Sequence, residues 1–184
     1  MYSFRMNDEN FEVQTFEGQT CPMCEQKTLT LMESERIIPY FGKVILFSMN
    51  CSSCHYHKSD VEIPERREPV KYSFVVENED DLKVRVIKSA EATVKVGKIA
   101  TIEPGIASNG YISNVEGLLQ RLKHQLEGIL NTEDAPEVLK KTKAHLKKLR
   151  RVLWGSDKIT ITITDPSGNS AIISDKAQVT KIKK

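Results

Sequence analysis

The sequence of 184 residues contains no long hydrophobic run. Its longest uninterrupted aliphatic or aromatic stretch, residues 44–47, is far shorter than the roughly 20 residues that a membrane-spanning helix requires. The first ten residues are polar and lack the apolar core of a secretory signal. These absences argue against a membrane protein and predict a cytoplasmic one, in which structural disulfides are rare.

The sequence also lacks the motifs of common catalytic sites. It has no glycine-rich phosphate loop, no Gly-x-Ser-x-Gly elbow and no convincing catalytic triad. It has four histidines, and none of them lies in the strands expected after residue 69, where a metalloenzyme built on a β-barrel would need ligands. We therefore expect a protein that is not an enzyme and has no small-molecule substrate.

The net charge of +2, from 27 basic and 25 acidic residues, favours no particular partner. The distribution of charge is more informative. Residues 1–69 carry 7 basic and 11 acidic groups, whereas residues 113–154 carry 9 basic and 5 acidic groups. The positive charge is therefore concentrated in the middle and C-terminal parts of the chain.

All four cysteines lie in two Cys-x-x-Cys motifs, Cys21-Pro22-Met23-Cys24 and Cys51-Ser52-Ser53-Cys54. A gap of two residues lets both thiolates of a motif reach one ion at about 2.3 Å, and two such pairs complete a closed tetrahedral shell. A shell without an open position is typical of structural zinc. The spacing predicts a zinc ribbon with one zinc ion, whose ligands are Cys21, Cys24, Cys51 and Cys54.

Three other interpretations of the cysteines remain open. Two disulfides would suit an oxidising compartment, and redox catalysis by one motif would require a strand–helix–strand context that is absent. Cys51-Ser52-Ser53-Cys54-His55 also matches the c-type haem attachment pattern, although haem would leave Cys21 and Cys24 without a role. With a complete shell of four cysteines, His55 and His57 are expected to be exposed polar residues.

The segment between the motifs predicts a β-hairpin formed by residues 28–32 and 43–49, with an apolar cluster at its end, residues 37–41. A small ribbon cannot bury such a cluster by itself. The cluster either docks against a neighbouring β domain or forms an exposed patch that binds a partner. The candidate contact residues of that patch are Ile38, Tyr40 and Phe41.

Residues 62–69 contain two prolines and five charges, which predicts a linker. Alternating apolar residues after the linker indicate strands. The expected strands cover residues 70–76, 82–86, 94–96 and 159–163; a turn at residues 165–168 then leads to a returning hairpin strand at 171–174, and a further strand covers 178–182.

Two amphipathic helices are expected between these strands, because apolar residues follow helical spacing over residues 115–130 and 138–153. Ser113 and Glu116 predict a capping box at the first helix, and Gly155 ends the second. The second helix carries a basic face. Its cations are Lys140, Lys141, Lys143, Lys147, Lys148, Arg150 and Arg151, against the single acid Glu137. Such a face is usually solvated, but it would also suit nucleic acid or an acidic protein.

The sequence resembles the ZPR1-type zinc-finger proteins over residues 15–155. One matching block comprises Cys21-Pro22-Met23-Cys24, Ile38-Pro39-Tyr40-Phe41, Val44-Ile45-Leu46-Phe47-Ser48-Met49, Cys51-Ser52-Ser53-Cys54 and Asp60-Val61. A second block comprises Glu103-Pro104-Gly105, Gly110 and Val115-Glu116-Gly117-Leu118-Leu119.

The resemblance implies a mainly β protein with an α-helical hairpin: a four-cysteine zinc ribbon, then a double-stranded β-helix (jelly-roll-like) domain. We expect the zinc-ribbon domain at residues 1–62 and the jelly-roll-like domain at 63–184, with the two-helix insertion at about 113–154. A single module of this kind is similar to the archaeal form of the family.

The resemblance also implies a non-enzymatic, zinc-binding adaptor or folding factor (a chaperone) that acts through protein–protein contacts. The implied partner is translation elongation factor 1-alpha. The alternative function is a nucleic-acid-binding zinc-ribbon factor in transcription or translation.

Overall fold

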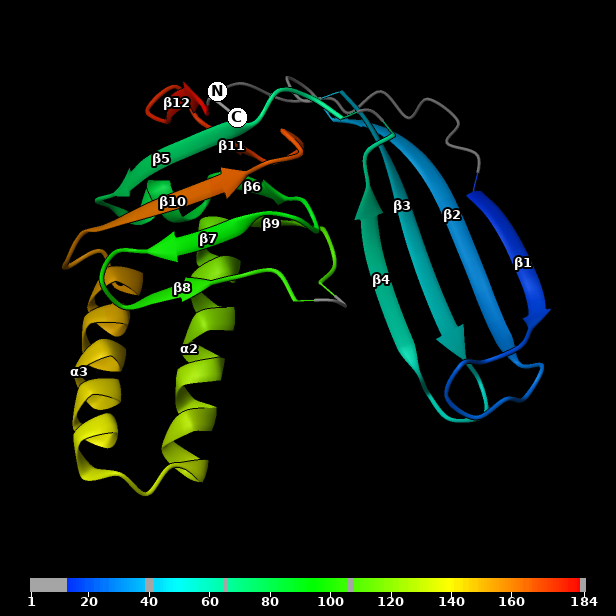
Figure 1. Ribbon diagram of the computed structural model, residues 1–184, viewed down its shortest axis with the longest axis horizontal. Helices are drawn as coiled ribbons and strands as arrows, with labels where there is room; N and C mark the ends of the chain where they lie inside the picture. Colours follow the sequence, from blue (N-terminus) through cyan, green and yellow to red (C-terminus); the bar gives the residue numbers. More distant parts are fainter. Residues whose placement is uncertain (1–12, 39–41, 65, 106–107, 183–184) are drawn as a thin grey trace. The chain divides into compact units, whose positions relative to one another are not determined.

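The computed structural model describes residues 13–38, 42–64, 66–105 and 108–182 (Figure 1). Contacts within the chain divide it into two units, Met1–Glu65 and Arg66–Lys184. The predicted domain boundary, between residues 62 and 63, lies at the end of the last strand of the first unit. No helix in the described ranges is long and apolar enough to cross a membrane.

The first unit is an antiparallel sheet in which each strand pairs with the next, in the order β1-β2-β3-β4. Its strands are β1 (Val13–Gln19), β2 (Leu29–Ile38), β3 (Gly42–Cys51) and β4 (His57–Glu62). The predicted hairpin is confirmed as β2 and β3, which are longer than expected and pair from Leu29 opposite Cys51 to Ile38 opposite Gly42. β4 was not expected from the sequence, because its polar residues lack an alternating apolar pattern.

The second unit contains two sheets, with strand orders β12-β5-β10-β7-β8 and β11-β6-β9. Their strands are β5 (Val70–Val76), β6 (Arg85–Lys88), β7 (Thr93–Val96), β8 (Ala100–Ile102), β9 (Tyr111–Asn114), β10 (Ile159–Asp165), β11 (Ala171–Ile173) and β12 (Gln178–Lys181). The helices are α1 (Glu79–Leu82), α2 (Val115–Thr132) and α3 (Pro136–Leu153). The last two form the predicted helical hairpin, which separates β9 from β10 in the sequence (Figure 1).

One hydrophobic core joins both sheets to α2 and α3. β5 and β10 pair over their whole lengths, and Phe74 and Ile161, which face each other, are both fully buried. Each helix turns one stripe of side chains inward: Val115, Leu118, Leu119, Leu122 and Leu126 from α2, and Thr142, Leu146, Leu149 and Val152 from α3. Burying a large aliphatic side chain contributes about 1.5–3 kcal/mol, so these stripes hold the hairpin on the sheets.

The helix starts differ from the prediction in two places. The residue that caps α2 is Asn114, whose side-chain oxygen accepts a hydrogen bond from the Gly117 N–H at 2.7 Å. The predicted capping box is wrong because Ser113 is still in β9, paired with Val86. The predicted strand over residues 82–86 is also wrong at its start, since Asn78 caps the short α1 by accepting from the Asp81 N–H. Gly155, with φ of 64°, ends α3 as predicted.

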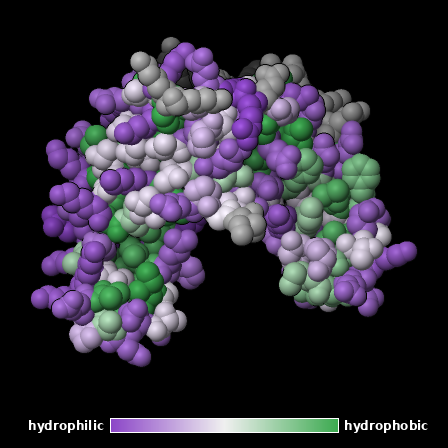
Figure 2. All heavy atoms as spheres, viewed as in Figure 1, coloured by the Kyte–Doolittle hydropathy of each residue, from purple (hydrophilic) through white to green (hydrophobic). Residues whose placement is uncertain are grey.

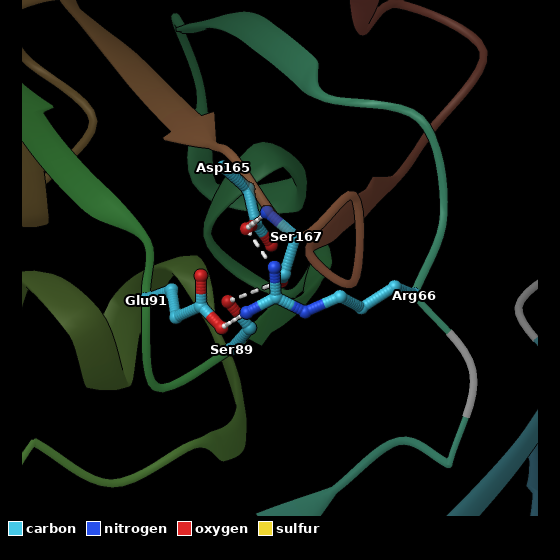
Figure 3. Close-up of polar contacts among 5 residues, drawn as sticks. All are labelled: Arg66, Ser89, Glu91, Asp165 and Ser167. Carbon is cyan, nitrogen blue, oxygen red and sulfur yellow. Dashed lines mark hydrogen bonds and ion pairs between the residues drawn. The ribbon is translucent and has the colours of Figure 1, made fainter.

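The expected hairpin between β10 and β11 does not form. Both edges of β10 are occupied, one by β5 and the other by β7, and β11 instead pairs with β6 in the other sheet. The intervening turn is fixed by Asp165, which is fully buried. Asp165 accepts hydrogen bonds from the Ser167 N–H at 2.8 Å and the Ser167 hydroxyl at 2.7 Å (Figure 3). It also accepts one from the Ser170 hydroxyl at 2.6 Å.

Gly168 in this turn cannot be replaced without strain, and we expect Gly168→Ala to destabilise the second unit by at least about 2 kcal/mol. Its φ is 73°, and an added Cβ would meet the Glu68 carbonyl oxygen, which is backbone and cannot rotate away. Urea unfolding would measure the loss. Gly128→Ala is the matched control: it lies in α2 with open space around it, so alanine should stabilise by up to about 1 kcal/mol. Equal stability of wild type and Gly168→Ala would contradict this account of the turn.

Candidate metal centre

The two Cys-x-x-Cys motifs fold into two turns of the same geometry. In the first, the Cys21 N–H donates to the Gln26 carbonyl and the Glu25 N–H donates to the Cys21 carbonyl, both at 2.9 Å. In the second, the Cys51 N–H donates to the Tyr56 carbonyl at 2.9 Å and the His55 N–H to the Cys51 carbonyl at 3.1 Å. This repetition turns both sulfurs of each motif toward one point.

Each turn places one non-glycine residue in the left-handed region of the backbone. Glu25 has φ of 58° and His55 has φ of 57°; each directly follows the second cysteine of its motif. A left-handed conformation costs roughly 1–2 kcal/mol for a residue with a side chain, so other interactions must compensate. His55 and His57 are exposed, as predicted, and His57 shares a 2.7 Å hydrogen bond with Asn50.

The four cysteine sulfurs lie within 4.8 Å of one another. The Cys21 and Cys54 sulfurs are 3.7 Å apart, and the Cys24 and Cys51 sulfurs are also 3.7 Å apart. Four sulfurs bound to zinc at about 2.3 Å form a tetrahedron with edges of about 3.8 Å. The sulfur positions therefore fit one tetrahedral zinc ion, and this pairing joins the two motifs crosswise.

The same distances bear on the alternative interpretations. All four cysteines are free thiols in this structure, and a sulfur separation of 3.7 Å is much longer than the roughly 2.05 Å of a disulfide bond. Both motifs contribute to one cluster, whereas haem attachment at Cys51 and Cys54 would use one motif alone. The cluster favours a shared metal ion.

The pKa values of the cysteines show what ionisation of the whole cluster needs. A hydrogen bond from the Thr28 hydroxyl at 3.3 Å, together with the Cys54 and Ser53 N–H groups, lowers the pKa of Cys51 to about 6. The Tyr56 N–H acts in the same direction on Cys54, but desolvation and hydrogen bonds to the three other thiols raise the pKa of Cys54 to about 12. Four adjacent thiolates repel one another, so all four are ionised together only when a metal ion neutralises them.

Thr28 lies beside the cysteine cluster, a position that was not expected from the sequence. Thr28 immediately precedes β2, and its hydroxyl lies 3.3 Å from the Cys51 sulfur and 2.9 Å from the Ser53 hydroxyl. It thereby supports a candidate ligand from outside both motifs. No spacing rule marks this position, because a threonine before a strand is common.

The structure does not expose all of the candidate partner-binding residues. Ile38, the last residue of β2, is buried, with 7% of its surface exposed. Neighbouring Ile37 is 75% exposed, as expected because successive side chains of a strand point to opposite faces. Tyr40 and Phe41 lie outside the described residues.

Comparisons with known proteins agree with this architecture. A family model described as the ZPR1 zinc-finger domain matches residues 12–68, and one described as the ZPR1 jelly-roll domain matches residues 80–184. An uncharacterised ZPR1-like protein of Pyrococcus horikoshii is 38% identical over 169 residues, 89% of this chain and 76% of that protein. A ZPR1-like protein of Methanocaldococcus jannaschii is 36% identical over 157 residues, 84% of this chain and 79% of that protein.

A eukaryotic relative is much longer than this chain. The zinc finger chaperone zpr1 of Schizosaccharomyces pombe is 34% identical over 140 residues, which cover 74% of this chain but 30% of that protein. The similarity therefore concerns one part of the larger protein.

The fold and the sulfur cluster define a zinc-finger protein in which a four-cysteine zinc ribbon precedes a jelly-roll domain with a two-helix insertion. The donor set suits one structural zinc ion. The chain belongs to the ZPR1 family.

Proposed function

We propose that this protein is a non-enzymatic chaperone or adaptor that acts in the cytoplasm by binding another protein, and that its partner is translation elongation factor 1-alpha. The observation that carries the non-enzymatic part of this proposal is the convergence of four sulfurs within 4.8 Å, and the partner is the one that the resemblance to the ZPR1-type proteins implies. A closed shell of four cysteines leaves zinc no open position for a substrate or water, so the metal supports structure rather than catalysis. The name of the S. pombe relative, a zinc finger chaperone, points in the same direction.

In this proposal Cys21, Cys24, Cys51 and Cys54 hold the zinc ion. When bound, zinc supplies folding energy that a small hairpin lacks. The cysteines join the ends of β2 and β3, since Cys51 pairs with Leu29 at the metal end of the hairpin. The metal thereby fixes the hairpin whose opposite end would meet the partner.

We further propose that the opposite end of the hairpin contacts the partner through Tyr40 and Phe41, whereas Ile38, which is buried, supports this end from beneath. The exposed side chain of Ile37, 75% accessible, adds apolar surface next to this segment. Exposed apolar surface at one place favours an interaction site.

Affinity capture from native cell extract tests the proposal. The zinc-loaded full chain should recover elongation factor 1-alpha, and prior removal of zinc with a chelator should abolish recovery. Tyr40→Ser/Phe41→Ser and Ile37→Ser should weaken capture without changing thermal stability. Val179→Ser, which also alters an exposed strand residue (58%), is the matched control and should bind normally. Absence of the factor from the captured proteins, or equal capture after zinc removal, would overturn the proposal.

A second candidate function is nucleic-acid binding, favoured by the basic face of α3. All seven of its cations are exposed: Lys140, Lys141, Lys143, Lys147, Lys148, Arg150 and Arg151. Phosphate contacts of this kind make binding fall steeply with salt. RNA that copurifies at low salt and is released between 50 and 200 mM salt, a range over which such contacts lose affinity by about 10³-fold or more, would favour this function; no retention of RNA or DNA would exclude it.

A further inference from the structure

The helical hairpin has a hollow on its surface with an apolar floor and a cationic rim. Its volume is about 420 Å³, and its lining residues are Leu130, Lys143, Leu146, Lys147, Arg150 and Arg151. We call this hollow the α2–α3 groove, because α2 supplies Leu130 and α3 supplies the rest. Figure 2 shows hydrophobic residues at the surface of the hairpin, with hydrophilic residues beside them along α3.

The cationic side chains of the rim outnumber the acidic side chains that form ion pairs with them. Arg150 pairs with Glu127 at 3.4 Å, and Arg151 pairs with Asp157 at 3.6 Å. Lys143 and Lys147 have no acidic partner in the described part of the chain. The groove therefore presents two uncompensated cations beside an apolar floor.

Trp154 directly follows α3 as its capping residue. It is the single tryptophan of the chain, and 81% of its surface is exposed. It follows Lys143, Lys147 and Arg151 at steps of four, four and three residues, the spacing of one helix face. Tryptophan is usually well buried and is enriched among the residues that dominate the binding energy of protein interfaces.

We propose that the α2–α3 groove, together with Trp154, binds an acidic amphipathic helix of a partner protein. The apolar side chains of that helix would pack against Leu130, above Leu146, which is only 3% exposed, while its carboxylates would meet Lys143 and Lys147. Recognition of an amphipathic helix in an apolar groove is a common mode of peptide binding. This inference goes beyond the proposed function, because it concerns a surface that contains no part of the zinc ribbon.

The composition of the groove favours a protein segment over nucleic acid. A phosphate backbone has no apolar group to place against Leu130, so the apolar floor of the groove would stay in contact with water. Platforms for single strands stack successive bases on several aromatic side chains, and this face offers Trp154 alone among its described residues. An acidic helix can use both the floor and the rim.

The fluorescence of Trp154 reports binding directly, because no other tryptophan contributes to the emission. The probe is a synthetic peptide of about 18 residues, long enough to be helical, with leucines on one face and glutamates on the other. Added to the zinc-loaded full chain, it should shift the emission to shorter wavelength and saturate. A peptide of the same composition but scrambled order, without an apolar face, should bind at least about 10-fold more weakly, a difference of about 1.4 kcal/mol.

Charge reversal at the rim distinguishes binding in this groove from nonspecific electrostatic attraction of the acidic peptide to the basic helix α3. Lys143→Glu/Lys147→Glu should weaken the peptide at least about 10-fold. Lys141→Glu/Lys148→Glu makes the same change of charge at exposed positions on another side of α3, and it should change affinity by less than about 2-fold. Thermal melting of both variants verifies that they fold.

Three results would overturn the inference: tighter binding of poly(U) RNA than of the amphipathic peptide, equal binding of the scrambled peptide, or equal loss in the two double variants. The assay contains no elongation factor and leaves zinc in place. Its failure would therefore leave the proposed function standing, and failure of the affinity capture would not affect this result.

Discussion

Cys51→Ser is expected to unfold the β1–β4 unit while the jelly-roll unit remains folded. The hydrophobic cluster at the metal site contains three buried residues, Cys21, Leu29 and Cys51, and two of them are proposed zinc ligands. A structural zinc ion contributes on the order of 10 kcal/mol to the folding of a small finger. A serine in place of one thiolate removes most of that contribution, so the small sheet should lose its order.

The second unit should stay folded because its hydrophobic core contains no residue from the strands of the first unit. In the described part of the chain, this core contains twenty buried residues between Phe74 and Ile172, and none of them comes from β1–β4. Amide NMR spectra should show loss of dispersion for residues of the first unit and unchanged signals for the second. Met23→Ser, at an exposed position within the first motif (68%), is the control and should leave both units intact. A variant spectrum with dispersed signals from β2 and β3 would contradict the claim that zinc fixes the ribbon.

The second large effect is expected at Asp165, the buried carboxylate that fixes the turn between β10 and β11. Asp165→Asn should lower the free energy of unfolding by about 3 kcal/mol at pH 7, because an amide nitrogen would face hydrogen-bond donors and leave a buried polar group unsatisfied. Ser167 and Ser170 donate to different oxygens of Asp165, and the amide keeps only one of these oxygens, so one of the two serines would lose its acceptor. Nearby Arg66 is paired with Glu91 at 2.7 Å on the surface, a type of pair that contributes little.

The pH dependence of this difference has a definite sign. Burial alone would raise the pKa of Asp165, but hydrogen bonds from Ser170, Ser167 and Ser89 outweigh burial and hold it below the ordinary value. A lowered pKa stabilises the folded state above the unfolded pKa of about 3.9 and loses that contribution as the pH falls through the folded pKa.

Urea unfolding of wild type and Asp165→Asn at pH 7 and pH 3 measures this. The difference between the two proteins should shrink at the lower pH. Asp175→Asn, which alters an exposed carboxylate of the same unit, should have little effect at either pH. A difference that stays constant, or grows as the pH falls, would show that the Asp165 charge does not stabilise the turn.

The sequence predicted those features that depend on local patterns. The cysteine spacing predicted the cluster, because only a closed turn brings two sulfurs of one motif together. The hairpin and both long helices followed from alternation and helical periodicity. β5 and β10 were predicted for the same reason, since each has one buried face.

The features that the sequence could not predict depend on long-range packing. β11 follows a turn sequence typical of a hairpin. It does not pair with β10, because both edges of β10 are paired with other strands, β5 and β7. Ser113 pairs with β6, so the residue that caps α2 is Asn114, one residue after the predicted cap. Thr28 matters because its hydroxyl lies beside the Cys51 sulfur. Trp154 matters because it is exposed at the end of α3. No local sequence pattern marks either position.

The central claim is that one zinc ion, bound by four thiolates, holds the ribbon together. Zinc X-ray absorption spectroscopy on freshly purified protein, combined with elemental analysis, tests this most directly. The account predicts one zinc per chain, surrounded by four sulfurs at about 2.3 Å. Metal well below one equivalent together with oxidised cysteines, or a first shell containing nitrogen ligands, would contradict it.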